Sequence, residues 1–345
     1  MKKALIIFSL LLASSSCLLA QTTTFSQGVF RYAPYGHSLL SDVHPYFVRL
    51  DVAGQSNHSE WDWGQTGKPW RVNVFGVFGF SLPIWRGNIV SDQYALSVTW
   101  PMSATIWLDL FEKTTAPVVN VDWRISMPAW TFLPRTKMGF LKNYSVCLAP
   151  FKHESTHVGD EVVLQHVDHG FPLRRVNVSY NYSEYIFTVN EAEDFRSECH
   201  TLRLGFMLLW APKEGWYFID ETDGDASLAQ PRMSPWEAYL QYQYQSPTSK
   251  HGFQAVVSAE IRNRALYGYP VFNWSETDGL EYEMQPEKRI FTYNIFVGAR
   301  FCNPKYDGYF SRFSMGIRAY HGNNPYGQFR NHKNYNHLGV CLIFE

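Results

Sequence analysis

The sequence predicts an all-β fold, a single antiparallel transmembrane β-barrel of about twelve strands, within a range of roughly ten to fourteen. The first observation is that short segments of alternating apolar and polar residues recur about a dozen times along the chain. The second is that 17% of the residues are aromatic, which is typical of the girdles that barrels place at membrane interfaces. The third is that no stretch after residue 20 is long and apolar enough for a spanning helix.

Two segments show the alternation most clearly. In residues 176–183 the two sets are Val176, Val178, Tyr180 and Tyr182 against Asn177, Ser179, Asn181 and Ser183. In residues 291–301 they are Phe291, Tyr293, Ile295, Val297, Ala299 and Phe301 against Thr292, Asn294, Phe296, Gly298 and Arg300. Successive strand side chains point to opposite faces, so each segment has one apolar face. In a closed sheet we expect acyl chains to cover that face.

The same pattern places strands along most of the chain. The predicted strands are residues 45–53, 70–81, 94–112 (as one strand or two), 118–128, 143–156, 174–188, 199–211, 236–246, 252–262, 290–301, 309–320 and 336–344. Pro and Gly are concentrated between them, where turns are expected. The longer polar connections, 213–235 and 263–289, are predicted to be extracellular loops. No linker divides the chain, so residues 21–345 are predicted to form one barrel domain.

The N-terminal residues have the pattern of a secretory signal peptide. Lys2 and Lys3 precede an apolar stretch over residues 4–13, and small residues follow. We expect cleavage after Ala20, which makes residues 1–20 the signal peptide. Cys17 leaves a lipoprotein signal as the less favoured alternative.

The C-terminal residues resemble the signal by which bacterial outer-membrane barrels are recognised for assembly. The matching positions are His337, Gly339, Leu342 and Phe344, and Glu345 follows the aromatic residue. The resemblance implies a location in the bacterial outer membrane and a partner, the barrel-assembly machinery, which would bind the C-terminal strand. Leu342 and Phe344 have the same parity, so both should face lipid.

Composition limits the partners. The formal net charge is −1 and no basic face is visible, so we predict no nucleic-acid binding. Membrane lipid is the predicted partner, while the sequence specifies no small-molecule ligand and no cofactor. Outside the predicted signal, the cysteines are Cys147, Cys199, Cys302 and Cys341, whose spacing matches no metal-binding pattern, and we assign no disulfide among them.

Residues 153–161, with the sequence HESTHVGDE, form the densest cluster of reactive side chains. The cluster contains H-E-x-x-H, which binds zinc when both histidines lie on one face of a helix. The residues that lead into it alternate as in a strand. His153 and His157 would then lie about 13 Å apart, too far for comfortable chelation of one ion. We therefore predict no metal site.

A strand places His153 and Ser155 on one face, about 6.6 Å apart along the chain. The imidazole can then act as a base for the serine hydroxyl. This H-x-S spacing is similar to that of outer-membrane phospholipase A and the lipid A deacylase barrels, which implies a serine-type lipid acyl hydrolase. Those families add an acidic or amide residue that orients the histidine. By sequence distance the nearest analogue is Asp168, with Asp160 and Glu161 as alternatives.

The longer motif resembles that of an uncharacterised family of bacterial outer-membrane barrels, a domain of unknown function with the pattern H-x-S-S-H-L-G-D-E. Thr156 and Val158 replace Ser and Leu of that pattern. Residues 120–124, Asn-Val-Asp-Trp-Arg, resemble the N-x-D-Y-R strand of the same family. The resemblance implies an outer-membrane barrel and brings no established reaction.

Strand parity predicts the face of the barrel on which the motif lies, and two functions remain open. Tyr144, Val146 and Leu148 should face lipid, which directs His153, Ser155 and His157 into the lumen; a bulge near Pro150 would reverse this. The favoured hypothesis is a structural or transport barrel whose lumen or rim holds a His/Ser/acid network, in which Asp160 and Glu161 pair with Arg174 or Arg175. The alternative is an acyl-ester hydrolase that uses Ser155 and His153.

Overall fold

In this computed structural model, the structure describes residues 38–56, 70–89, 94–109, 118–134, 144–159, 175–176, 179–190, 196–210, 218–219, 236–266, 269–275, 279–285, 288–302, 312–329 and 335–345. None of the helices in these ranges is long and apolar enough to cross a membrane. The predicted signal peptide, residues 1–20, lies outside them and stays a prediction.

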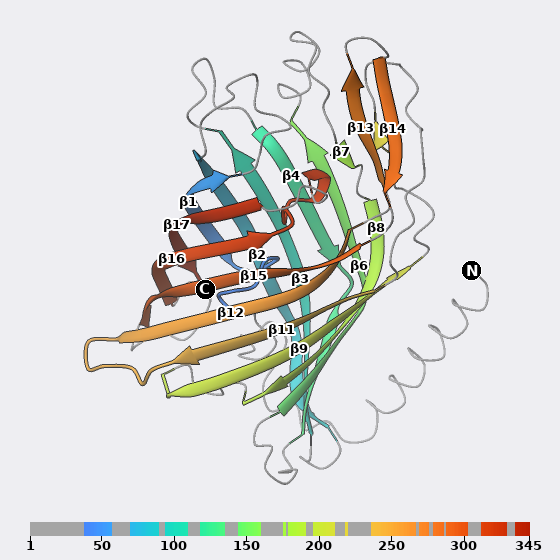
Figure 1. The fold of residues 1–345 in the computed structure, drawn as a ribbon. Coiled ribbons are helices and arrows are strands. Elements are labelled where there is room, and N and C mark those ends of the chain that lie inside the picture. Colours follow the sequence, from blue (N-terminus) through green and yellow to red (C-terminus); the bar gives the residue numbers. More distant parts are fainter. Residues whose placement is uncertain are drawn as a thin grey trace, which may run out of the picture.

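The described strands form one closed antiparallel barrel (Figure 1). Its strands are β1 (Val48–Ser56), β2 (Arg71–Ile89), β3 (Tyr94–Leu108), β4 (Val118–Ser126), β5 (Ala129–Pro134), β6 (Tyr144–Val158), β8 (Ser179–Val189), β9 (Cys199–Trp210), β11 (Trp236–Gln245), β12 (Phe253–Leu266), β15 (Lys288–Cys302), β16 (Arg312–Gly322) and β17 (Tyr335–Phe344). β1 pairs with β17, which closes the sheet. β4 and β5 lie end to end between β3 and β6 and occupy one strand position in the wall. The barrel therefore has twelve strands around its circumference, and the predicted fold class is confirmed.

Two short two-stranded sheets lie apart from the barrel sheet. β13 (Tyr269–Ser275) pairs with β14 (Gly279–Gln285), and β7 (Arg175–Val176) pairs with β10 (Phe218–Ile219). The predicted connection over 263–289 is shorter than expected, because β12 continues to Leu266 and β15 begins at Lys288, and most of it is the β13–β14 hairpin. Its extracellular location stays a prediction. In Figure 1 this hairpin extends beyond the barrel at the top.

The barrel is inverted relative to a soluble protein, with apolar side chains outside and charges inside. On β17, Leu338 and Val340 are each 53% exposed and Phe344 is 40% exposed. Arg49, Arg264, Arg300 and Arg318 are among the largest fully buried side chains. An apolar outer surface of this kind requires acyl chains around it, because contact between so much apolar surface and water is unfavourable.

The two clearest alternating segments face in different directions. Phe291, Ile295 and Val297 of β15 point outward, as expected. Tyr180 and Tyr182 of β8 point into the lumen, 5% and 2% exposed, so the expectation that this apolar face meets lipid is wrong. The reason is that the C-terminal half of β8 places Tyr185 and Phe187 outward. Because side chains alternate along the strand, Tyr180 and Tyr182 then point inward.

Residues 38–47 lie inside the barrel instead of extending its first strand. The Leu40 N–H donates to Gln243 Oε1 at 3.0 Å, and the Ser41 N–H donates to Ser258 Oγ at 3.1 Å. Both acceptors are on the inner wall. Gly79 allows the segment to lie flat, because a Cβ there would come within 2.9 Å of the Phe47 nitrogen. Protein therefore fills the lumen near the end of the barrel where β11 connects to β12.

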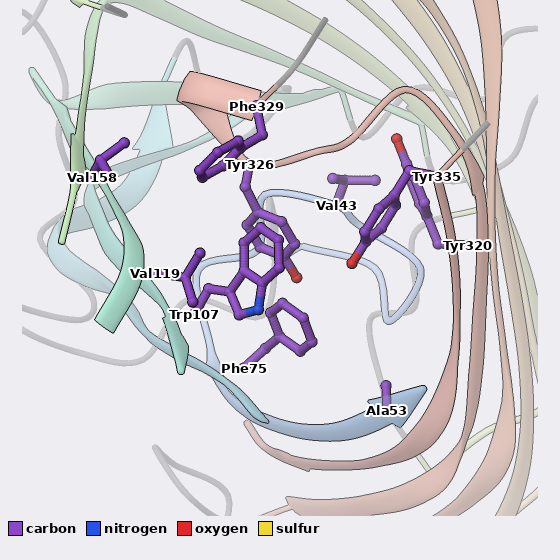
Figure 2. Close-up of a cluster of buried hydrophobic side chains, with 10 residues drawn as sticks. All are labelled: Val43, Ala53, Phe75, Trp107, Val119, Val158, Tyr320, Tyr326, Phe329 and Tyr335. Atoms are coloured by element: carbon purple, nitrogen blue, oxygen red, sulfur yellow. The ribbon is translucent and has the colours of Figure 1, made fainter. Parts of the chain in front are cut away.

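Residues 323–329, which end in the short helix η1 (Gly327–Phe329), fill the lumen nearer its other end. Figure 2 shows Phe75, Trp107 and Tyr326 grouped inside the ring of strands. The Phe75 and Tyr326 rings stack with centroids 4.9 Å apart. The Gly327 N–H donates to both carboxylate oxygens of Asp122, at 3.2 and 3.3 Å. A Cβ at Gly327 would come within 1.9 Å of Thr156, so the close approach requires glycine.

Glu345, directly after β17, closes the end of the sheet. Arg300 donates to both Glu345 carboxylate oxygens at 3.0 Å, and Ser314 donates to one of them at 3.0 Å. Burial alone would raise the pKa of this carboxyl, but Arg300 and Arg312 hold the pKa below its ordinary value. The carboxylate therefore stabilises the fold in its charged form.

We expect Glu345→Gln to lower the free energy of unfolding by about 1–2 kcal/mol near pH 7, because it removes charge-assisted hydrogen bonds. A carboxyl whose pKa is depressed by folding stabilises above its unfolded pKa of about 4.3 and ceases to do so as the pH falls through its folded value. Melting temperatures in detergent, measured from pH 7 into the acid range, should converge for wild type and variant. A difference that does not change with pH would contradict the role assigned to this charge.

Candidate functional site

A bulge divides β6 into two halves. Ala149 pairs with Glu184 and Lys152 pairs with Tyr182, so Pro150 and Phe151 together face the single residue Ser183 of β8. The Ser183 hydroxyl donates to the Pro150 carbonyl at 2.8 Å. Proline lacks a backbone donor and is tolerated at such an irregularity.

The bulge reverses the parity of the upper half of β6. Before the bulge, Tyr144, Val146 and Leu148 point outward, whereas after it Lys152, Glu154 and Thr156 are buried in the lumen. His153, Ser155 and His157 are therefore on the outer face of the wall. The parity prediction that placed them in the lumen is wrong, and the alternative with a bulge near Pro150 is confirmed.

β4 and β5 carry a matching irregularity at Met127 and Pro128. The Met127 N–H donates to the Phe151 carbonyl at 2.9 Å, which joins the two irregularities. On both sides of this point the ladder to β6 keeps its register, with Ser126 opposite Lys152 and Trp130 opposite Leu148. The upper halves of the two strands are thus displaced together.

On the outer face, the His153 ring is held from the neighbouring strand. Asn181 of β8 lies directly opposite His153, and its Oδ1 is 2.8 Å from the ring Nδ1. Because a carbonyl oxygen accepts, Nδ1 carries the proton and Nε2 remains as the basic nitrogen. Among the described residues, His153 makes this hydrogen bond and none to Ser155.

The polar residues of this outer face have apolar neighbours. On β4, Trp123 lies opposite Ser155 and Ile125 lies opposite His153, 52% and 51% exposed. The rings of Phe151 and Trp210 meet edge to face with centroids 5.7 Å apart. The candidate site, defined here as His153, Ser155, Ser179 and Asn181, is a polar patch with the apolar side chains of Trp123 and Ile125 beside it on β4.

A charged network lies on the lumen side of the same strands. Glu154, between His153 and Ser155 in the chain, has Arg124 directly opposite on β4 and Tyr180 directly opposite on β8. Arg124 Nε is 3.4 Å from Glu154 Oε2, and the Tyr180 hydroxyl donates to the same oxygen at 2.9 Å. Glu154 thus fastens β4, β6 and β8 together behind the candidate site.

Three of the five predicted site residues, Asp160, Glu161 and Asp168, lie outside the described residues, as do the Arg174 side chain and that of Arg175. Asn181 was not among the predicted residues, because strand register is not visible in the sequence. Its one sequence signal is that it belongs to the polar set of residues 176–183, of which the structure turns Ser179 and Asn181 outward.

Within the described ranges, no group of three or more His, Cys, Asp or Glu side chains is arranged to hold a metal ion. The H-E-x-x-H residues lie on strand β6, not on a helix. Cys147, Cys199, Cys302 and Cys341 are free thiols.

A second outward His–Asn pair lies on the opposite part of the wall. His321 Nδ1 of β16 is 2.7 Å from Asn336 Oδ1 of β17. Residue 319, which faces the same way two positions before His321, is alanine, and residue 323 is a buried asparagine. This pair therefore has no adjacent serine and provides an internal control for the candidate site.

The fold is similar to two solved outer-membrane structures. Outer membrane phospholipase A from Escherichia coli is 13% identical, with a TM-score of 0.44, over 90% of this chain and 95% of that chain. The Salmonella typhi outer membrane phospholipase dimer with bound calcium is 13% identical, with a TM-score of 0.43, over 91% of this chain and 94% of that chain. No family model matches the chain, and neither does any curated protein. Membership of the uncharacterised barrel family therefore stays a prediction.

Proposed function

We propose that the protein is an acyl-ester hydrolase of the bacterial outer membrane, with Ser155 as nucleophile, His153 as general base and Asn181 as the residue that orients the imidazole. The observation that carries the proposal is the 2.8 Å hydrogen bond from His153 to Asn181 on the outer face, beside a serine that points the same way. A nucleophile, a base and a group that holds the base are the parts that an activated serine needs.

The energetic setting supports this function over a purely structural one. Polar side chains that face acyl chains cost free energy, and the feature that separates this site from the outward His321–Asn336 pair is the serine beside the histidine. The structural network that the sequence suggested fits the lumen half of the motif, where Glu154 pairs with Arg124. It does not explain why the outer half is polar.

The chemistry follows the usual order for an activated serine. His153 Nε2 takes the Ser155 proton while Ser155 Oγ bonds to the acyl carbon. The ester carbon–oxygen bond then breaks, and the leaving alcohol receives the proton from His153. Water, deprotonated by the same nitrogen, releases the fatty acid and restores the serine.

The position of the site favours a membrane lipid as substrate. Ser155 lies three residues from the end of β6 that leads to the long connection over 159–178, whereas the opposite end of the barrel has short connections such as 90–93 and 246–252. Long connections are typical of the extracellular side. The candidate site would then meet lipid close to the outer interface, where ester groups lie.

The experiment is to incubate purified protein in detergent with phospholipid and, separately, with lipid A, both with divalent cations and with chelator, and to measure free fatty acid. We expect release from at least one substrate. We also expect a fluorophosphonate to block it and to label the peptide that contains Ser155. No release under any condition, together with no labelling of Ser155, would contradict the proposal.

A further inference from the structure

The proposed reaction requires a hydrogen-bond donor that no residue assigned so far supplies. Attack on an ester carbonyl places negative charge on its oxygen, and enzymes stabilise this oxyanion with donors already in position. At the height of Ser155, the backbone of β6 is paired with Trp123 of β4 on one side and with Ser179 of β8 on the other. The β6–β8 ladder ends at this pair, and side chains on the outer face beside Ser155 are candidates for the donor.

Ser179 is in the right place to be that donor. It lies directly across from Ser155 and on the same outer face, and residues opposite each other in an antiparallel pair have Cβ atoms about 4.5–5.5 Å apart. Among the described residues, neither hydroxyl is engaged in another hydrogen bond. The proton of Ser179 is therefore available to a group bound at Ser155.

The direction of the reaction also favours Ser179. The leaving oxygen must be near His153, which protonates it, so the carbonyl oxygen points away from His153. Among the described residues, three outward side chains with polar hydrogens lie beside Ser155: Ser179 and Trp123 across the two strand pairs, and His157, two residues along β6 at about 6.6 Å. Ser179 is nearer than His157, and unlike Trp123 it belongs to the strand that already holds His153 through Asn181.

We propose that Ser179 is a catalytic residue that donates its hydroxyl hydrogen bond to the oxyanion formed when Ser155 attacks the acyl carbonyl. As the Ser155 oxygen–carbon bond forms, the carbonyl π electron pair moves to the oxygen, which accepts from Ser179. The pair returns when the ester bond breaks. Ser179 keeps its proton throughout. The inference rests on the proposed hydrolase function and adds a residue to it.

The test compares Ser179→Ala, Ser179→Thr and His157→Ala in the full-length protein, on the phospholipid or lipid A substrate that the wild type cleaves. We expect Ser179→Ala to lower kcat by about 10²–10³ with little change in KM, because the bond is made only in the transition state. Ser179→Thr, which keeps a hydroxyl, should recover most of the rate. The rate of Ser155 labelling by fluorophosphonate should fall in parallel in the alanine variant, while heat-modifiable migration on gels verifies folding.

The outcomes separate this inference from the proposed function. If Ser155→Ala is inactive while Ser179→Ala keeps kcat within about twofold of wild type, Ser179 is not the donor and the hydrolase remains. A loss confined to His157→Ala would likewise overturn the assignment. If the wild type cleaves no acyl ester, both proposals fail together.

Discussion

Replacing Ser155 with alanine should reduce fatty-acid release by about 10⁴-fold or more, because the variant lacks the oxygen that forms the acyl intermediate. The residual rate would come from substrate binding and the oxyanion donor, with water attacking in place of the serine. Stability should change little, since Ser155 lies on the outer face and makes no hydrogen bond to a described residue. The measurement is fatty-acid release at saturating substrate, with heat-modifiable gel migration to verify folding.

His153→Ala should have an effect of similar size, and the Ser155→Ala/His153→Ala double variant should be no worse than either single variant. Residues that act as one catalytic unit are non-additive in this way. The matched control is His321→Ala, which removes an outward histidine bonded to an asparagine at 2.7 Å but without an adjacent serine. It should retain the wild-type rate. Equal losses in His153→Ala and His321→Ala would indicate a general effect on the outer wall rather than catalysis.

Arg124→Met should produce the largest loss of stability, about 3–5 kcal/mol, because it leaves buried carboxylates without their cation. Arg124 lies 3.5 Å from Asp122 and 3.4 Å from Glu154, and both acids are 0% exposed. Urea unfolding in detergent, followed by tryptophan fluorescence, measures the change. Lys250→Met, at an exposed turn, is the control and should stay within about 0.5 kcal/mol of wild type.

A rescue experiment tests whether unpaired charge is the cause. Adding Asp122→Asn and Glu154→Gln to Arg124→Met should restore much of the lost stability, because neutral amides do not repel one another. If the triple variant is less stable than Arg124→Met alone, packing of the arginine side chain, and not charge pairing, determines the effect. The rescue also keeps the prediction measurable if Arg124→Met alone fails to fold.

The barrel could be predicted from the sequence because a lipid-facing wall imposes a period of two on every strand. That signal located β15, β16 and β17 to within a few residues. It could not show that residues 38–47 enter the lumen, because that segment is held by hydrogen bonds from its backbone to Gln243 and Ser258, which carry no periodicity. The continuation of β4 into β5 was missed for a related reason: Met127 and Pro128 interrupt the pattern.

The candidate site was only half visible in the sequence. His153 and Ser155 could be identified because they lie two apart in one strand, so their common face follows from local geometry. The orienting residue could not, because Asn181 reaches His153 through the register between two strands and lies 28 positions away. Sequence distance pointed to Asp168 instead. The direction in which the pair faces depended on whether Pro150 marked a bulge, which alternation alone does not reveal.

The paired irregularities in β4/β5 and β6 restrict which insertions and deletions homologous sequences can carry. Each strand carries its additional residue at the same height, so the ladder between the two resumes correctly on either side. Loss of a residue from one strand alone would reverse the side-chain direction of the half that contains Trp123 or Glu154. Trp123 would then face the lumen, or Glu154 would face lipid. Insertions and deletions at Met127–Pro128 and Pro150–Phe151 should therefore be inherited together, and a lineage that lost both would carry its histidine and serine sealed inside the barrel.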